Sequence, residues 1–159
     1  MSSIASHLSE ELIVLPMRAT GREGALRELL MPLQMLHIID ASDATLDSIL
    51  KRERRMSTGV GKGVALPHGL SPNVKDLALV VGISPGGIDF KAVDGALCHI
   101  FVLLVSPADQ PDSHLKTLGR ISKLLGESDL RSALLDSETA GQVISTLQAW
   151  DSPPDEMPI

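Results

Sequence analysis

The chain has 159 residues, which suffice for one domain with a hydrophobic core. Its net charge of −6 and its lack of tyrosine argue against nucleic-acid binding, because phosphate backbones attract cationic surfaces and single strands stack on aromatic rings. The single cysteine, Cys98, excludes an internal disulfide, and no apolar run approaches the roughly 20 residues of a membrane span, so we expect a cytoplasmic protein without membrane insertion.

The N-terminal part of the chain predicts a strand followed by a helix. Residues 11–16, ELIVLP, favour a strand that the proline ends. In the helix, Thr20 and Glu23 have the spacing of a capping box, and Pro32 predicts a kink. The apolar face of this helix is predicted to contain five leucines: Leu26, Leu29, Leu30, Leu33 and Leu36.

Three further helices are predicted. The second runs into the basic residues 51–55, the third ends at Gly126, and the last spans roughly residues 137–150. The second helix has two candidate N-cap residues, Ser42 and Asp43. The third helix also has two, Asp112 and Ser113. The apolar face of the third helix is predicted to contain Leu115, Leu118, Ile121, Leu124 and Leu125.

Two apolar runs, 77–83 and 99–105, predict strands that are buried on both faces. Turn signals between them leave room for one short strand at 88–90. Buried strands that alternate with amphipathic helices predict an α/β fold. We therefore expect a single-domain sandwich over residues 1–150, with a central mixed sheet flanked by helices on both sides, and a flexible tail at 151–159.

A glycine-rich stretch, TGVGKGVALPHG at 58–69, raises the question of phosphate binding. A Walker A loop requires Ser or Thr after Gly-Lys, but Gly63 follows Lys62. A dinucleotide fingerprint requires its third glycine one position later than Gly63. Both nucleotide-binding interpretations therefore fail on spacing.

His68 is the candidate nucleophile of this stretch. A short strand at 64–66 ends at Pro67, which fixes the backbone before His68, and Gly69 allows the chain to turn away. An imidazole with a pKa of about 6.5 is largely neutral near pH 7. It accepts a phosphoryl group on one nitrogen while a backbone carbonyl holds the proton of the other. The alternative is an ordinary loop histidine.

The segment RERRMSTGVGKGVALPHG, 52–69, closely resembles the phosphorylation-site signature of the fructose/mannitol-type (type 2) enzyme IIA domains of the bacterial phosphoenolpyruvate-dependent phosphotransferase system. The likeness continues through IDFKAVDG and IFVLLVSPADQPDSHLKTLGRISKLL and covers nearly the whole chain. The segment around LLVSPADQ is more similar to the nitrogen-regulatory branch than to the sugar-specific proteins.

The resemblance implies a phosphocarrier without cofactor or metal. His68 would take a phosphoryl group from an HPr-like protein and pass it to an enzyme IIB or signal its phosphorylation state to a regulatory target such as a kinase or transporter. His114 corresponds to the second histidine of the family, and Arg52 and Thr58 are expected to stabilise the phosphoryl group. The site loop then contains Ser57, Gly59, Gly61, Lys62, Gly63, Pro67 and Gly69.

From the residues alone, His114 is a polar residue in the first turn of a helix, where the macrodipole is expected to depress its pKa. Arg52 could equally be a solvated cation near a helix C-terminus, and Thr58 could hold the loop through backbone bonds. Lys62 departs from the family pattern, in which many relatives have Asn or an acidic residue at this position. Leu70 departs from it as well, because a polar or basic residue is common there. We assign no chemistry to the other ring and thiol groups: His7, His37, His99 and Cys98.

Three alternatives to the regulatory phosphocarrier stay open. The first is a sugar-specific fructose/mannitol enzyme IIA component. The second is a binding module that retains the fold and regulates a transporter or kinase by contact alone. A hydrolase that uses the two candidate histidines ranks last, because the sequence has no metal-ligand set or nucleophilic serine motif.

Overall fold

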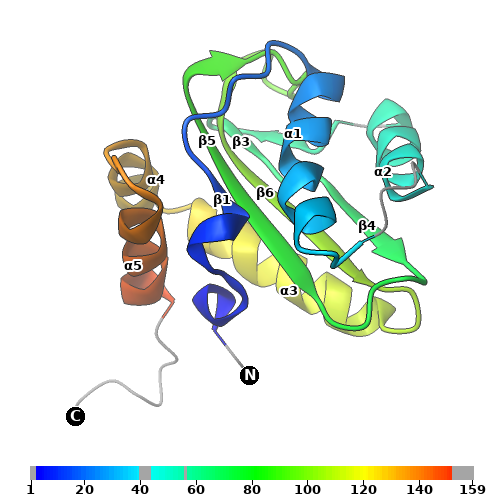
Figure 1. The fold of residues 1–159 in the computed structure, drawn as a ribbon. Coiled ribbons are helices and arrows are strands. Elements are labelled where there is room, and N and C mark those ends of the chain that lie inside the picture. The colour runs from blue at the N-terminus through cyan, green and yellow to red at the C-terminus, as the bar shows by residue number, and fades with distance from the viewer. Residues whose placement is uncertain (1–2, 40–43, 56, 152–159) are drawn as a thin grey trace.

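A computed structural model describes residues 3–39, 44–55 and 57–151 of the chain. Its helices are η1 (Ile4–His7), η2 (Glu10–Leu12), α1 (Arg22–Met35), α2 (Ala44–Arg55), α3 (Pro111–Leu125), α4 (Ser128–Leu135) and α5 (Ala140–Trp150). Its strands are β1 (Ile13–Val14), β2 (Gly59–Gly61), β3 (Val64–Ala65), β4 (His68–Ser71), β5 (Ala78–Ile88) and β6 (Cys98–Pro107). Figure 1 shows α1 and α3 on opposite sides of the sheet.

The strands form one mixed sheet in the order β1-β5-β6-β3-β2. β5 and β6 pair antiparallel at its centre, and β1 joins β5 in parallel. β3 and β4 both run parallel to β6, β3 beside Ile100 and Phe101 and β4 beside 104–107. One edge of β6 therefore carries two short strands in succession, separated by Leu66 and Pro67.

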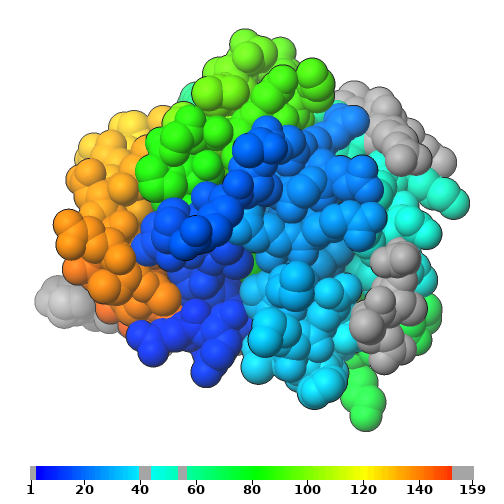
Figure 2. Space-filling model, turned by 45° about the horizontal axis from the view of Figure 1, so that its top comes forward, coloured from blue at the N-terminus to red at the C-terminus, as the bar shows by residue number. Residues whose placement is uncertain are grey.

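Side chains of the central strands alternate between two hydrophobic cores. In β5, Val80 packs with α1 and α2, whereas Leu79 and Val81 pack with η1, α3, α4 and α5. β6 alternates in the same way, with Leu103 on the first face and Leu104 on the second. The predicted α/β sandwich, with helices on both sides of a mixed sheet, is confirmed. Figure 2 shows the N-terminal segment between α1 and the α4–α5 region on the molecular surface.

The start of α1 differs from the prediction. Gly21 is the N-cap residue and makes no side-chain capping bond, so the predicted Thr20–Glu23 box does not form. Glu23 instead pairs with Arg27 one turn later, at 3.1 Å. The helix continues through Pro32 to Met35, and Leu36 is exposed rather than part of its buried face.

Turn signals between the two apolar runs lie at 85–87 and at Asp94-Gly95. The turn at Asp94-Gly95 forms, with the Gly95 N–H bonded to the Ala92 carbonyl at 3.0 Å. The predicted turn at 85–87 and the separate short strand at 88–90 are wrong. β5 continues as one strand from Ala78 to Ile88, with a register shift against β6 between Ile83 and Ile88. Gly87, with φ +81°, lies in this irregular part, where its Cβ would meet His99. The glycines at this point therefore produce a bulge in a continuous strand. At the other end of the fold, β1 is shorter than predicted because 3-10 helix η2 occupies Glu10–Leu12.

The C-terminal helices also differ in detail from the prediction. α3 begins at Pro111 with Gln110 as N-cap, so Asp112 and Ser113 lie inside its first turn, and Leu115 is 66% exposed. α4 was not predicted, and α5 begins at Ala140 behind the Thr139 cap. The alternative caps Ser42 and Asp43 of the second helix lie outside the described residues.

Asp151, the first residue of the predicted flexible tail, is part of the folded domain. The carboxylate of Asp151 is buried and bonds Arg120 of α3 at 2.7 Å and the backbone N–H of Ile4 in η1. The rest of the predicted tail, 152–159, lies outside the described residues. Across the described part of the chain, no helix has the length and apolar character needed to cross a bilayer.

Candidate phosphoryl-transfer site

His68 is the first residue of β4, directly after the two residues that separate β3 from β4 along β6. Leu104 of β6 donates its backbone N–H to the Pro67 carbonyl at 3.0 Å, and His68 is then in register with Leu104. The chain does not turn away at Gly69, as the sequence predicted, but continues as β4. Gly69 is needed for a different reason: a Cβ there would lie 3.0 Å from Ile49 Cγ1, so its absence allows α2 to pack against β4.

The half-buried His68 ring is oriented by its own backbone. Its Nδ1 lies 2.8 Å from the Leu66 carbonyl oxygen. A carbonyl only accepts hydrogen bonds, so Nδ1 carries the proton and donates it. The lone pair of neutral His68 is then on Nε2, which fits the sequence-based expectation that a carbonyl holds one ring proton while the other nitrogen is the nucleophile.

The structure brings His114 to His68. The ring centroids are 5.4 Å apart at an interplanar angle of 52°. His114 lies in the first turn of α3, is only 6% exposed, and its Nδ1 is 2.7 Å from Ser106 Oγ of β6. The pKa of His114 is lowered, mainly by burial and to a smaller extent by electrostatic repulsion from His68. The predicted direction is therefore confirmed, with burial rather than the helix macrodipole as the main cause.

The glycines of the site loop build a tight hairpin between β2 and β3. Gly61 pairs with Val64, so Lys62 and Gly63 are the two turn residues, with φ +59° and +78°. A two-residue hairpin with both φ values positive is a type I′ turn, which favours Asn-Gly. The Asp94 carboxylate accepts a hydrogen bond from the Lys62 backbone N–H at 3.1 Å, and this bond contributes to a lowered pKa of Asp94 after the bond from the Ala96 N–H.

Gly59 is required by close packing rather than by a special φ. A Cβ at Gly59 would lie 2.8 Å from the Cα and Cβ of Ala92. The Gly59 carbonyl accepts the Val93 N–H at 3.1 Å, which joins the hairpin to the segment after β5. Ser57 supports the same junction, because its hydroxyl donates to the Phe90 carbonyl at 2.8 Å and accepts the Gly59 N–H at 3.0 Å.

Thr58 holds the loop to the end of α2. Its backbone N–H and its hydroxyl donate to the two carboxylate oxygens of Glu53 at 2.7 and 2.6 Å. Glu53 is 1% exposed and Thr58 is 5% exposed. The hydroxyl hydrogen of Thr58 is thus used by Glu53, which corrects the expectation that this side chain donates to a phosphoryl group. Sequence reasoning gave Glu53 no role, although it stands in the signature next to Arg52.

Two predicted site residues are exposed. Arg52 lies on α2, the helix that packs against β4, immediately before the buried Glu53. The side chain of Lys62 extends from the hairpin turn and lines a shallow cavity with Leu66 and Leu125. Leu70, the other departure from the family pattern, follows in β4 and is 36% exposed.

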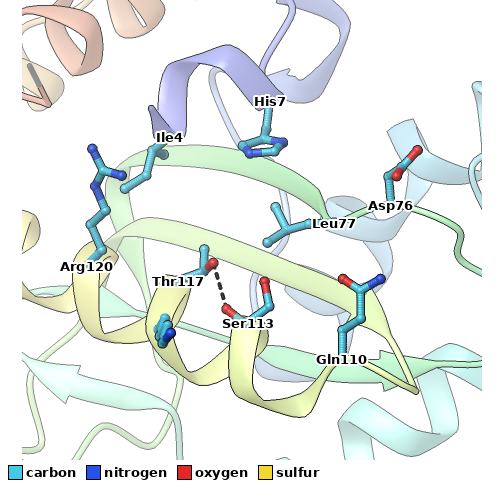
Figure 3. A pocket seen from close by; sticks show the side chains of 9 residues that line it. Ile4, His7, Asp76, Leu77, Gln110, Ser113, Thr117 and Arg120 are labelled. Atoms are coloured by element: carbon cyan, nitrogen blue, oxygen red, sulfur yellow. Dashed lines mark hydrogen bonds between the residues drawn. The ribbon is translucent and has the colours of Figure 1, made fainter. Parts of the chain in front are cut away.

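A larger cavity of about 760 Å³ lies beside α3, and neither His68 nor His114 lines it. Figure 3 shows His7 from η1 facing α3, where the Thr117 hydroxyl donates to the Ser113 carbonyl at 2.9 Å. Of the other groups without predicted chemistry, His99 bonds the Ser84 carbonyl through Nδ1 at 3.0 Å. Cys98 is buried, which raises its pKa to about 11 and makes it an unreactive core thiol.

Residues 6–150 match the family model described as "Phosphoenolpyruvate-dependent sugar phosphotransferase system, EIIA 2". The chain belongs to this family of phosphotransfer components, which work through a phosphohistidine. It is 31% identical over 144 residues to a nitrogen regulatory protein of Bradyrhizobium diazoefficiens, covering 91% of this chain and 94% of that protein. It is 29% identical over 148 residues to a fructose-specific EIIABC component of Bacillus subtilis, covering 93% of this chain but only 23% of that protein.

The fold is also found among solved structures. The nitrogen regulatory protein IIA-Ntr of Neisseria meningitidis superposes with a TM-score of 0.83 at 26% identity, over 91% of this chain and 98% of that one. Both nitrogen regulatory proteins and a fructose-specific EIIABC component are therefore similar to this chain.

Proposed function

We propose that His68 is the phosphoryl acceptor of this EIIA domain and that the donor is a phosphorylated HPr-like protein. The observation that carries the proposal is the 2.8 Å bond between His68 Nδ1 and the Leu66 carbonyl. It holds the nucleophilic lone pair on Nε2 before any partner binds. In the transfer, Nε2 forms a bond to phosphorus, the bond between phosphorus and the donor's histidine nitrogen breaks, and the electron pair returns to the donor's ring.

His114, Arg52 and the glycine-rich hairpin surround this step with distinct roles. His114 is close, buried and kept neutral, so it donates a hydrogen bond to the phosphoryl group without adding a permanent cation. The exposed Arg52 supplies a guanidinium fork for phosphoryl oxygens. Ser57 and Thr58 hold the hairpin, and the hairpin in turn holds the Leu66–His68 segment through the Leu66 N–H bond to the Thr58 carbonyl at 2.9 Å.

Downstream, we infer a nitrogen-type regulatory role in which phosphorylation of His68 is read by a kinase or transporter. The similarity to two nitrogen regulatory proteins supports this assignment. The alternative is a sugar-specific component that passes the group to a cysteine of an enzyme IIB, which the similarity to a fructose-specific protein supports. A module that acts by contact alone, without phosphorylation, is the remaining alternative.

The test is a reconstitution with phosphoenolpyruvate, enzyme I and an HPr-type carrier, followed by measurement of acid-labile, base-stable phosphate on the protein. Wild type is expected to be labelled and His68→Ala to be unlabelled. His114→Ala is expected to be labelled but to pass phosphate onward slowly. His37→Ala is the matched control. His37 is exposed just after α1, so this variant should be labelled like the wild type.

Labelling of His68→Ala at the wild-type level would overturn the site assignment. An unlabelled wild-type protein that still binds the carrier would favour the contact-only module. Adding a fructose-type enzyme IIB separates the other two roles: rapid loss of phosphate from His68 to the IIB cysteine supports sugar transport, and retention of the phosphate supports the regulatory protein.

A further inference from the structure

Ser106 is a buried hydroxyl in β6 that directly follows the apolar residues 100–105. It is 1% exposed, and its Oγ lies 2.7 Å from Nδ1 of His114. Its neighbours in β6 are the fully buried Leu103, Leu104 and Val105. Within the described residues, this contact is the one hydrogen bond that the Ser106 side chain makes.

The direction of this hydrogen bond follows from the burial of Ser106. If His114 Nδ1 carried the proton and donated it, the hydroxyl hydrogen of Ser106 would be buried without an acceptor among the described residues. Leaving a buried donor unsatisfied destabilises the folded protein. If Ser106 donates instead, the hydroxyl hydrogen and the Nδ1 lone pair satisfy each other. The second arrangement is therefore the stable one.

With Nδ1 acting as acceptor, the proton of neutral His114 is on Nε2. Nε2 makes no hydrogen bond with another described residue. Every fully buried side-chain N or O atom of the described residues has a hydrogen-bond partner, so Nε2 is not fully buried and is accessible to a ligand. His68 has the opposite tautomer, because the Leu66 carbonyl holds its Nδ1–H and leaves Nε2 unprotonated. The two rings, 5.4 Å apart, thus combine one Nε2 lone pair with one Nε2–H donor.

We propose that Ser106 is a positioning residue that fixes His114 in the Nε2–H tautomer, so that His114 donates a hydrogen bond to a phosphoryl oxygen on His68. The role of the donated bond rests on the proposed function, but the tautomer itself does not. Without Ser106, His114 exchanges between two tautomers, and only one of them offers a donor.

The direct test is a long-range ¹H–¹⁵N NMR correlation spectrum of the unphosphorylated protein labelled with ¹⁵N-histidine, at a pH where His114 is neutral. It distinguishes protonated from unprotonated ring nitrogens. The wild-type spectrum is expected to show Nε2 protonated and Nδ1 unprotonated for His114, with the reverse for His68. Finding the proton of wild-type His114 on Nδ1 would overturn the proposal, whatever any variant does.

Variants of Ser106 then connect the tautomer to transfer. Ser106→Ala is expected to give a mixture of His114 tautomers and to slow transfer through His68 in proportion to the lost Nε2–H population, about twofold when the two tautomers are equally populated. Ser106→Thr keeps the hydroxyl and should restore both. Ser84→Ala is the matched control, because Ser84 is a buried serine of the neighbouring strand β5 that bonds His99 only through its carbonyl.

A double-mutant cycle tests whether Ser106 acts through His114. Adding Ser106→Ala to His114→Ala should not slow transfer further, whereas an additional loss as large as that of Ser106→Ala alone would show an independent role and contradict the proposal. Failure of this inference is distinct from failure of the proposed function. A wild type with the wrong tautomer but normal labelling refutes only the role of Ser106, and an unlabelled wild type with the expected tautomers refutes only phosphoryl transfer.

Discussion

At the scale of single residues, the proposed phosphoryl transfer depends on which of the two ring nitrogens of each histidine carries the proton. The Leu66 carbonyl and the Ser106 hydroxyl give His68 and His114 complementary tautomers, and neither contact uses a charged group. The two contacts thus leave a lone pair on Nε2 of His68 and a hydrogen-bond donor on Nε2 of His114, the pair that the proposed transfer needs.

Acid is expected to destabilise the protein through His114. The pKa of His114 is lowered in the folded state, mainly by burial, so the unfolded chain takes up this proton first as the pH falls. The associated stability is complete above the unfolded pKa of about 6.5 and is lost as the pH falls from there to the lower folded pKa. Urea unfolding from about pH 7.5 to about pH 5 measures the loss. His114→Gln should lose less free energy of unfolding over this range, and an equal loss in both proteins would contradict the assignment.

The candidate nucleophile could be predicted from the sequence because its environment is local. Leu66, Pro67 and His68 are adjacent, and the carbonyl that orients the ring lies two residues before it. Ser106 and Glu53 could not be assigned roles in the same way, because each acts through a contact that only tertiary packing creates. A serine at the end of the run IFVLLVS is a weak sequence signal, which becomes informative only when α3 places His114 against it.

At the scale of elements, the β2–β3 hairpin requires positive φ values at three consecutive residues, 61–63, and only two of them are glycines. The glycines at 61 and 63 accept positive φ without strain, but Lys62 adopts φ +59° with a full side chain. The Asp94 carboxylate bonds the backbone N–H of Lys62 and so helps to hold this conformation. The site is thus built on a turn whose first residue is not the preferred one.

Lys62→Asn is expected to stabilise the protein by about 0.5–1 kcal/mol, because Asn tolerates the left-handed region and Asn-Gly is the favoured type I′ pair. The free energy of unfolding in urea checks this value. Lys62→Gln is the matched control, since it removes the same charge without favouring the turn, and it should leave stability nearly unchanged. Equal stabilisation by Gln and Asn would assign the effect to charge and contradict the turn-based explanation.

The element predictions succeeded where hydrophobic periodicity was long and failed where local signals competed with packing. β5 and β6 followed from continuous apolar runs. The proline and glycines at 85–87 indicated a turn, yet pairing with β6 absorbed them as a bulge. The Thr20–Glu23 spacing suggested a cap that does not form, and the exposed Leu115 shows that helical spacing alone does not define a buried face.

At the scale of the whole molecule, one buried carboxylate joins three helices. Asp151 follows α5, pairs with Arg120 of α3 through both Nε and Nη2, and accepts the N–H of Ile4 in η1. These contacts connect the N-terminus and the C-terminal helix to α3, the helix that carries His114. Asp151 therefore links the helix that carries His114 to two other helices of the same face of the sheet.

Asp151→Asn is expected to lower the free energy of unfolding by about 2–3 kcal/mol, because it removes the buried negative charge that pairs with Arg120 and replaces one acceptor oxygen with an NH2 group that cannot accept a hydrogen bond. Thermal or urea unfolding measures the change. Asp136→Asn makes the same substitution at the exposed C-cap of α4 and should change stability by less than about 0.5 kcal/mol. Equal effects of the two substitutions would show that the Asp151 contacts contribute little.

The proposed transfer requires that His68, held through Nδ1, carries the phosphoryl group on Nε2. NMR of the ¹⁵N-histidine-labelled protein after phosphorylation by enzyme I and an HPr-type carrier identifies the atom directly, through coupling between ³¹P and the ring nitrogens. We predict phosphorus bonded to Nε2 of His68, with its Nδ1–H still bonded to the Leu66 carbonyl. Phosphorus on Nδ1 of His68, or on any other residue, would contradict the account.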